Sequence, residues 1–106
     1  MQYNLDQIAS REIIKGFHAK FIHTAQVTIG FIDIESGSRL PEHQHVHEQT
    51  TTVLSGKLEL TVDGQVHILE AGQAVVIPSN IRHSALAHMD CKAIDVFSPV
   101  REDYKF

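Results

Sequence analysis

The sequence predicts a single all-β domain, and three observations support this fold class. Short apolar segments are separated by turn residues at intervals of about 8–12 residues, as in sandwiches and barrels. No segment has a helical period long enough for a crossover helix, and only Leu5–Ser10 suggests a helical turn. The 106 residues suffice for one domain but not two, and 42% hydrophobic with 21% charged residues is typical of a globular protein. We therefore expect one antiparallel sandwich or barrel.

Two of the predicted strands surround a tight turn. Leu58–Val62 and Gln65–Leu69 flank Asp63-Gly64, a pair that favours positive φ angles and a two-residue hairpin. Three further strands are expected at the ranges Gln26–Ile34, Ala74–Ile77 and Lys92–Phe97.

The alternation within Gln26–Ile34 indicates which side chains enter the core. Val27, Ile29 and Phe31 occupy every second position, which predicts that they form the buried face of this strand.

Charge and hydropathy exclude several classes of partner. The formal net charge is −4 and no Lys/Arg cluster is present, so no nucleic-acid partner is expected. No stretch of ~18 apolar residues could form a membrane span. The polar N-terminus, Met1–Ser10, does not resemble a signal peptide, which predicts a cytoplasmic protein. A small molecule is the expected partner.

Histidine is unusually frequent, with eight in the chain. His43, His45 and His47 fall within five positions and share one parity with Gln49. Clustered histidines are a metal-binding signal, but on one extended strand these four side chains would be too many for a single ion.

Two spaced motifs contain these residues. The first is Gly37-x5-His43-x-His45-x3-Gln49-x6-Gly56, and the second is Gly72-x5-Pro78-x-Asn80-x2-His83. Both resemble the paired motifs of the cupin family, with glutamine at Gln49 where glutamate is usual and asparagine at Asn80 where glycine is usual. The resemblance covers about Ile29 to Val100.

This resemblance implies a cupin double-stranded β-helix, or jelly roll, comprising residues 1–106 as a single domain with its barrel at about 26–100. It also implies one divalent metal ion held by His43, His45, Gln49 and His83, with coordination positions left for water or substrate. Nickel, zinc, iron and manganese all accept such ligands. The neutral amide of Gln49 would leave the full 2+ charge on the ion, favouring Lewis-acid over redox chemistry. Binding by Glu48 or His47 instead, or an empty site, remains open.

A narrower resemblance lies in His43–Gln49 and Ile94–Asp103. Both segments are similar to small cupins of the pectin-degradation family, which convert 4,5-unsaturated monouronates to a linear keto form. That family also has glutamine as its third ligand, and it places residues matching Asp95, Phe97 and Arg101 near the substrate.

The resemblance implies a role for each of these three residues. Asp95 would act as acid or base, Phe97 would pack against the sugar ring, and Arg101 would bind the substrate carboxylate. The structural alternatives are a bonded, half-buried carboxylate at Asp95, a core aromatic at Phe97, and an exposed ion pair of Arg101 with Glu102 or Asp103.

Three functional hypotheses follow. They are a metal-dependent, isomerase-type enzyme that opens unsaturated uronates, a cupin dioxygenase or other oxidoreductase, and a non-catalytic cupin that binds a sugar or small acid. Ile94 and Val96 lie on the opposite parity to Asp95 and are apolar, so the last strand is apolar on both faces. A homodimer that covers the outer face is therefore expected.

Overall fold

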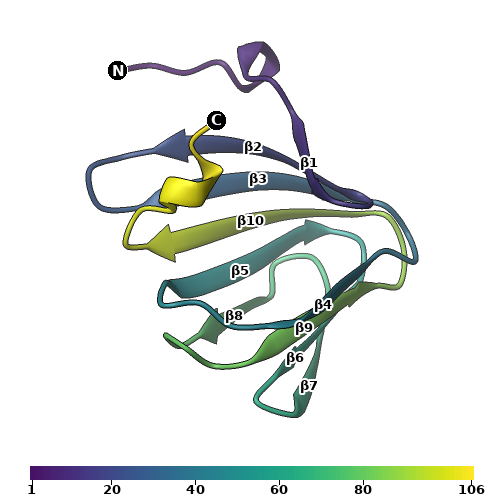
Figure 1. Cartoon of the computed structure of the whole chain (residues 1–106). Coiled ribbons are helices and arrows are strands. Elements are labelled where there is room, and N and C mark those ends of the chain that lie inside the picture. Colours follow the sequence, from purple (N-terminus) through teal and green to yellow (C-terminus); the bar gives the residue numbers. More distant parts are fainter.

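Two antiparallel β-sheets enclose the core of the protein, as Figure 1 shows for the computed structural model of residues 1–106. The six-stranded sheet contains, in spatial order, β1 (Arg11–Ile14), β2 (Phe17–His23), β3 (Thr28–Ile34), β10 (Cys91–Ser98), β5 (Glu48–Ser55) and β8 (Ala74–Ile77). The four-stranded sheet contains β4 (Arg39–His43), β9 (His83–Ala87), β6 (Leu58–Val62) and β7 (Gln65–Leu69). The predicted all-β single-domain architecture is confirmed.

The two helices are single 3-10 turns, η1 (Leu5–Gln7) and η2 (Glu102–Tyr104). The first lies within the segment that suggested a helical turn. Neither helix approaches the length or the apolar character that a membrane-spanning helix would need. The barrel was expected to begin at about residue 26. β1 and β2 lie before that position and belong to the six-stranded sheet, which therefore begins at Arg11.

The Asp63-Gly64 hairpin forms as predicted. Asp63 has a φ of 49° and Gly64 a φ of 78°, and Val62 faces Gln65 across the β6–β7 ladder. Positive φ at both central residues matches the right-handed twist of the two strands.

The predicted core face of β3 is wrong. Thr28, Ile32 and Ile34 point inward and are buried, whereas Ile29 and Phe31 lie half-buried on the opposite face. Both parities of this strand carry large apolar residues, so alternation alone could not identify the inner one. Inward Thr28 is accommodated because its hydroxyl group is hydrogen-bonded.

The hydrophobic core lies between the sheets. The six-stranded sheet contributes Phe17, Ile34 and Val53, and the four-stranded sheet contributes Leu58 and Leu60. Phe17, Ile34, Leu58 and Leu60 also line the cavity that contains the histidines of the spaced motifs, so the core forms the apolar part of its wall.

Candidate functional site

The four predicted metal ligands come from both sheets. His43 ends β4 and lies opposite His83, the first residue of β9, in the four-stranded sheet. Gln49 lies in β5 of the six-stranded sheet, and His45 lies in the connection between β4 and β5. This connection separates β4 from β5, so His43, His45, His47 and Gln49 do not lie on one continuous strand, although they share one parity in the sequence. The ligand group instead forms where the chain passes between the sheets.

Each of the three histidines is oriented by a backbone carbonyl. Nδ1–H of His43 donates to the Pro41 oxygen at 2.8 Å, that of His83 donates to the Ile81 oxygen at 2.8 Å, and that of His45 donates to the His47 oxygen at 2.9 Å. Because Nδ1 carries the proton in each ring, Nε2 carries the lone pair. Such bonds are the usual support of metal-binding imidazoles.

The amide of Gln49 is oriented in the same way. Its Nε2 donates to Thr51 Oγ1 at 3.0 Å, which directs Oε1 toward Nε2 of His45 at 3.1 Å. With Nδ1 of His45 protonated, both of these facing atoms are acceptors. Two lone pairs at this distance repel each other unless a cation lies between or beside them.

The donor set fits a divalent metal ion. One ligand atom from each of His43, His45 and His83 lies within 4.8 Å of the others. The His83 residue is 2% exposed, and its Nε2 atom is buried without a hydrogen-bond partner. Burial lowers the pKa of His45, and it lowers the pKa of His83 to about 4. Both rings are therefore neutral near pH 7, which is the form that binds metals.

The alternative ligands lie outside this group. Glu48 is exposed, and His47 uses its backbone oxygen to anchor His45. The ring of His47 stacks edge-on against His45 with 5.5 Å between ring centroids, and it is not part of the three-histidine cluster.

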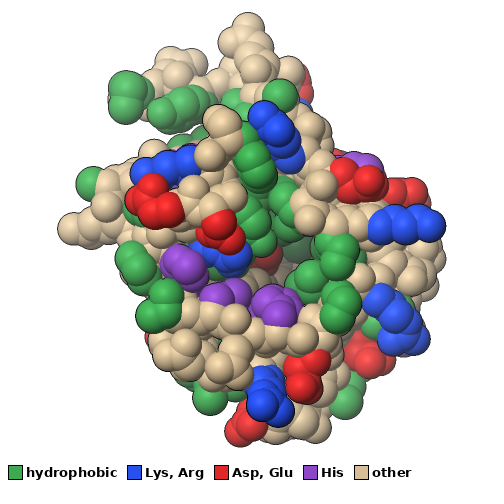
Figure 2. Space-filling view, viewed as in Figure 1, with side chains coloured by type: hydrophobic (Ala, Val, Ile, Leu, Met, Phe, Trp, Pro, Cys, Tyr) green, Lys and Arg blue, Asp and Glu red, His purple; other side chains and the backbone are tan.

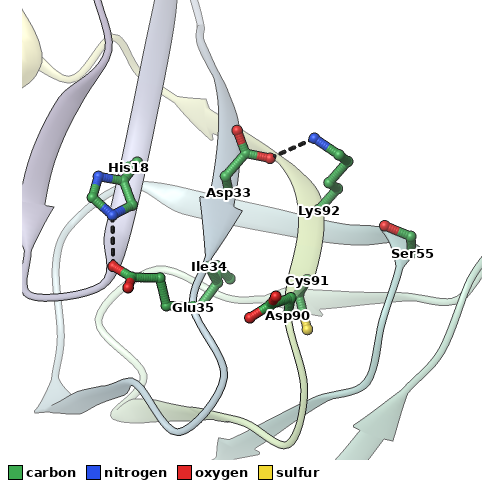
Figure 3. Close-up of a pocket in the computed structure, with 8 residues that line it drawn as sticks. All are labelled: His18, Asp33, Ile34, Glu35, Ser55, Asp90, Cys91 and Lys92. Atoms are coloured by element: carbon green, nitrogen blue, oxygen red, sulfur yellow. Dashed lines mark hydrogen bonds and ion pairs between the residues drawn. The ribbon is translucent and has the colours of Figure 1, made fainter.

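Another histidine, His18, borders a separate hollow where β3 ends and β10 begins. Its Nε2 lies 2.8 Å from the Glu35 carboxylate and 3.5 Å from that of Glu12, and Figure 3 shows the Glu35 contact. The Glu35 hydrogen bond raises the pKa of this exposed ring. Because His18 is already paired with carboxylates, it does not resemble the neutral histidines of the β4–β9 group.

Asp95 lies on the inner face of β10 and is 9% exposed. It accepts a hydrogen bond from Thr51 Oγ1 at 2.6 Å, so Gln49, Thr51 and Asp95 form a continuous chain of hydrogen bonds. Its hydrogen-bond partner is therefore the Thr51 hydroxyl. Burial raises the pKa of Asp95 to about 6, against the opposing effect of the Thr51 bond.

Phe97 and Arg101 lie beside the histidines. The Phe97 ring is buried with its centroid 5.9 Å from that of His45, and the Arg101 guanidinium lies 4.9 Å from the Phe97 ring centre. Arg101 also forms an ion pair with Asp103, as one structural alternative predicted, but the residue is 8% exposed and not on the open surface. Its guanidinium is stacked on Tyr104 at 4.0 Å.

All seven predicted site residues line one cavity of about 120 Å³ between the sheets. Figure 2 shows a hollow on this face of the molecule, with histidine side chains along one rim and hydrophobic side chains along the other. The arrangement combines three lone-pair donors, an amide oxygen, a carboxyl group and a guanidinium in one small space. It can bind a cation, move a proton and recognise an anion.

Thr51 and Tyr104 line the same cavity and were not predicted from the sequence. Thr51 could have been predicted, because this residue lies two positions after Gln49 and therefore shares a strand face with Gln49. Asp103 and Tyr104 lie in η2, where no periodicity indicates orientation.

These geometric features agree with comparisons to known proteins. The cupin domain family matches residues 30–97, and the chain belongs to this family. The solved structure of KdgF from Halomonas sp. has a TM-score of 0.91 and 28% identity, covering 97% of this chain and 96% of that one.

Two curated relatives also match. The pectin degradation protein KdgF of Dickeya dadantii is 33% identical over 64 residues, covering 58% of each chain. The polyketide synthase CurC of Streptomyces cyaneus is 36% identical over 64 residues, covering 57% of this chain and 42% of its own length. The matched part of this chain thus spans about half the length of these two relatives. The resemblance to small cupins of the pectin-degradation family is supported by both KdgF matches.

Proposed function

We propose that the protein is a metal-dependent, non-redox enzyme that converts 4,5-unsaturated monouronates to the linear keto form. The observation that carries this proposal is the presence of Asp95 and Arg101 in the same cavity as the His43, His45, Gln49 and His83 group. The similarity to two KdgF proteins, one of which is named for pectin degradation, supports the same substrate class.

The proposed reaction is an isomerisation in which atoms and electrons balance. The cyclic hemiacetal opens as the anomeric hydroxyl loses its proton and the bond between the anomeric carbon and the ring oxygen breaks. The released enol then becomes a ketone when its C4 carbon gains a proton. One proton therefore moves between two positions of the substrate, and neither an oxidant nor a reductant is required.

Asp95 is the proposed proton carrier. Its pKa of about 6 lies close to neutral pH, where a carboxyl group can both accept and return a proton. The Thr51 hydroxyl holds the carboxyl by donating to one of its oxygens. Arg101 would bind the substrate carboxylate, and the buried face of Phe97 would pack against the sugar ring.

His43, His45, Gln49 and His83 are proposed to hold one divalent ion, and nickel, zinc, iron and manganese are the candidates. When bound, such an ion supplies a Lewis acid that polarises substrate oxygens. The proposed ligand atoms are neutral, namely three imidazole nitrogens and one amide oxygen, and burial lowers the pKa of His45 and His83. The absence of a carboxylate ligand favours this chemistry over that of iron oxygenases, which use a carboxylate-containing triad.

The test is direct turnover of a 4,5-unsaturated galacturonate by the metal-loaded protein. We expect the ultraviolet absorbance of the unsaturated ring to decay faster with wild-type protein than in buffer, and His83→Ala to lose this acceleration. Equal decay rates for buffer, wild type and His83→Ala would contradict the proposal. Oxygen uptake coupled to turnover would instead indicate a cupin dioxygenase.

The similarity to CurC favours one second candidate, a reaction on a polyketide-type substrate. The cavity volume argues for the smaller sugar acid, because about 120 Å³ is below the roughly 300–1,000 Å³ typical of sites for larger ligands. Turnover of an aromatic polyketide precursor, with none of the uronate, would favour this alternative.

We also propose that the protein is a homodimer that uses the outer face of the six-stranded sheet. A row of registered residues crosses this face, namely Ile22, Ile29, Val96, Thr50 and Val76. Val76 is 59% exposed, and Phe31 and Ile94 form a neighbouring pair. A second copy would cover this largely apolar surface.

A further inference from the structure

The segment after β10 is attached to the sheet through its first charged residue. The backbone N–H of Arg101 donates to Thr28 Oγ1 at 2.9 Å, and Thr28 is fully buried at the start of β3. Thr28 faces His23 across the β2–β3 ladder, with Oγ1 2.8 Å from Nδ1 of the His23 ring. Since the hydroxyl oxygen already accepts from Arg101, its own proton is free to be donated to Nδ1.

His23 completes this connection on its other side. Its Nε2 lies 3.1 Å from the backbone oxygen of Tyr104, 81 positions further along the chain. A neutral imidazole that accepts at Nδ1 and donates at Nε2 satisfies both contacts. The hydrogen bonds therefore run from Arg101 through Thr28 and His23 to Tyr104. We call Thr28 and His23 the clasp.

The guanidinium of Arg101 depends on the segment that the clasp holds. Its Nε and Nη2 donate to the two oxygens of Asp103 at 2.9 and 2.7 Å, and its face rests on the Tyr104 ring. Asp103 and Tyr104 both belong to η2. The side-on pair with Asp103 uses one edge of the guanidinium, so the Nη1 donors remain for another anion.

We propose that His23 and Thr28 are positioning residues that fix η2, and through it hold the free edge of Arg101 at the cavity for the substrate carboxylate. This inference rests on the proposed function for the identity of the carboxylate. Neither residue lines the cavity, and neither is a candidate metal ligand. Their effect would therefore reach the substrate through the segment that they hold, which contributes Arg101 and Tyr104 to the cavity.

Thr28→Val and Thr28→Ser form the matched test, because valine keeps the shape of threonine while serine keeps its hydroxyl. Each is assayed as metal-loaded protein on 4,5-unsaturated galacturonate and on its uncharged methyl ester. We expect Thr28→Val to raise KM for the acid by about tenfold with kcat nearly unchanged. KM for the ester should not change, and Thr28→Ser should behave as wild type.

His23→Phe provides a second variant if Thr28→Val does not fold, because His23 is only partly buried and phenylalanine preserves its stacking on Phe21. It should cause the same selective loss for the acid. A general structural role would instead weaken acid and ester alike. An unchanged acid-to-ester ratio in both the Thr28→Val and His23→Phe variants would overturn the proposal.

Hydrogen exchange separates this inference from the proposed function. In the clasp variants the backbone amides of residues 101–106 should exchange faster than in wild type, with equal metal content. If wild type turns over neither compound, the proposed function fails, and the carboxylate role of the clasp fails with it. Faster exchange in the clasp variants would then support only the claim that the clasp fixes residues 101–106. Unchanged exchange would overturn that claim as well.

Discussion

Asp95 is buried, and burial disfavours the charged form of its carboxyl group. Burial raises its pKa from 3.8 to about 6. Between these values the folded metal-free protein retains a proton that the unfolded chain has released. The stability contributed by the carboxyl group is therefore complete below pH 3.8 and is lost as the pH rises through about 6.

Asp95→Asn should therefore stabilise the metal-free protein at neutral pH while removing activity. A shift of this size corresponds to about 3 kcal/mol, and the variant should have no such advantage below pH 3.8. Loss of the proton carrier should lower kcat by about 10²–10⁴-fold. Urea unfolding across pH measures the first effect, and uronate turnover measures the second.

The matched control is Asp33→Asn, because Asp33 is an exposed carboxylate paired with Lys92. It should show no comparable gain at neutral pH. The burial argument would be contradicted if Asp95→Asn were less stable than wild type and the loss of stability were the same at neutral and at acidic pH.

Metal affinity should depend on the ligand group and on the residue that orients Gln49. His43→Ala and His83→Ala should abolish stoichiometric metal binding, whereas His47→Ala should retain it. Thr51→Val removes the acceptor of the Gln49 amide and should weaken binding by about 10–100-fold.

Calorimetric titration with zinc or nickel measures these affinities, with Thr51→Ser as the control that keeps the hydroxyl. If His47 proved essential and His43 dispensable, the assigned ligand register would be wrong.

At the scale of elements, the turn between β5 and β6 depends on a close backbone approach. Gly56 has a φ of +92°, and a Cβ atom there would lie 2.2 Å from the backbone oxygen of Asp90. By contrast, Gly72 has a φ of +85° with no atom within 4 Å of such a Cβ. Both glycines belong to the spaced motifs, but only Gly56 combines positive φ with a steric conflict.

Gly56→Ala should consequently destabilise the protein more than Gly72→Ala. Positive φ alone costs alanine about 1–2 kcal/mol, and the contact with Asp90 adds to this at Gly56. Denaturant unfolding of the two variants gives the comparison. Equal losses would mean that the Asp90 backbone moves aside at little cost.

Asn80 illustrates how a motif position can change residue without changing conformation. It stands where the motif usually has glycine, and its φ is 61°. Asparagine tolerates this left-handed region better than most residues, so the turn before β9 is preserved.

At the scale of the whole molecule, the apolar outer face of the six-stranded sheet determines the expected assembly. Val96 lies at the centre of the registered row on this face. Light scattering at micromolar concentration should give the mass of a dimer for wild type. Val96→Lys should give a monomer with an unchanged metal affinity, because Val96 points away from the cavity. A monomeric wild type would refute the homodimer.

Residue spacing predicted much of the fold and of the candidate site. The hairpin at Asp63-Gly64 depends on local φ preferences, so it could be predicted from two residues. The spaced glycines and histidines predicted which side chains would meet, and the structure brings His43, His45 and His83 together. Neither inference requires knowledge of distant contacts.

Other features were decided only by the tertiary structure. The inner face of β3 could not be predicted, because both of its parities are apolar and the choice depends on which sheet lies opposite. The attachment of Arg101 to Thr28, and of Tyr104 to His23, joins segments more than 70 positions apart. The sequence by itself determined the all-β class and the hairpin, because these follow from local preferences, and the resemblance of its spaced motifs to those of cupins supplied the set of candidate ligands. Burial arises only when the two sheets pack, and the position of Arg101 depends on hydrogen bonds to β2 and β3, which are distant in the sequence.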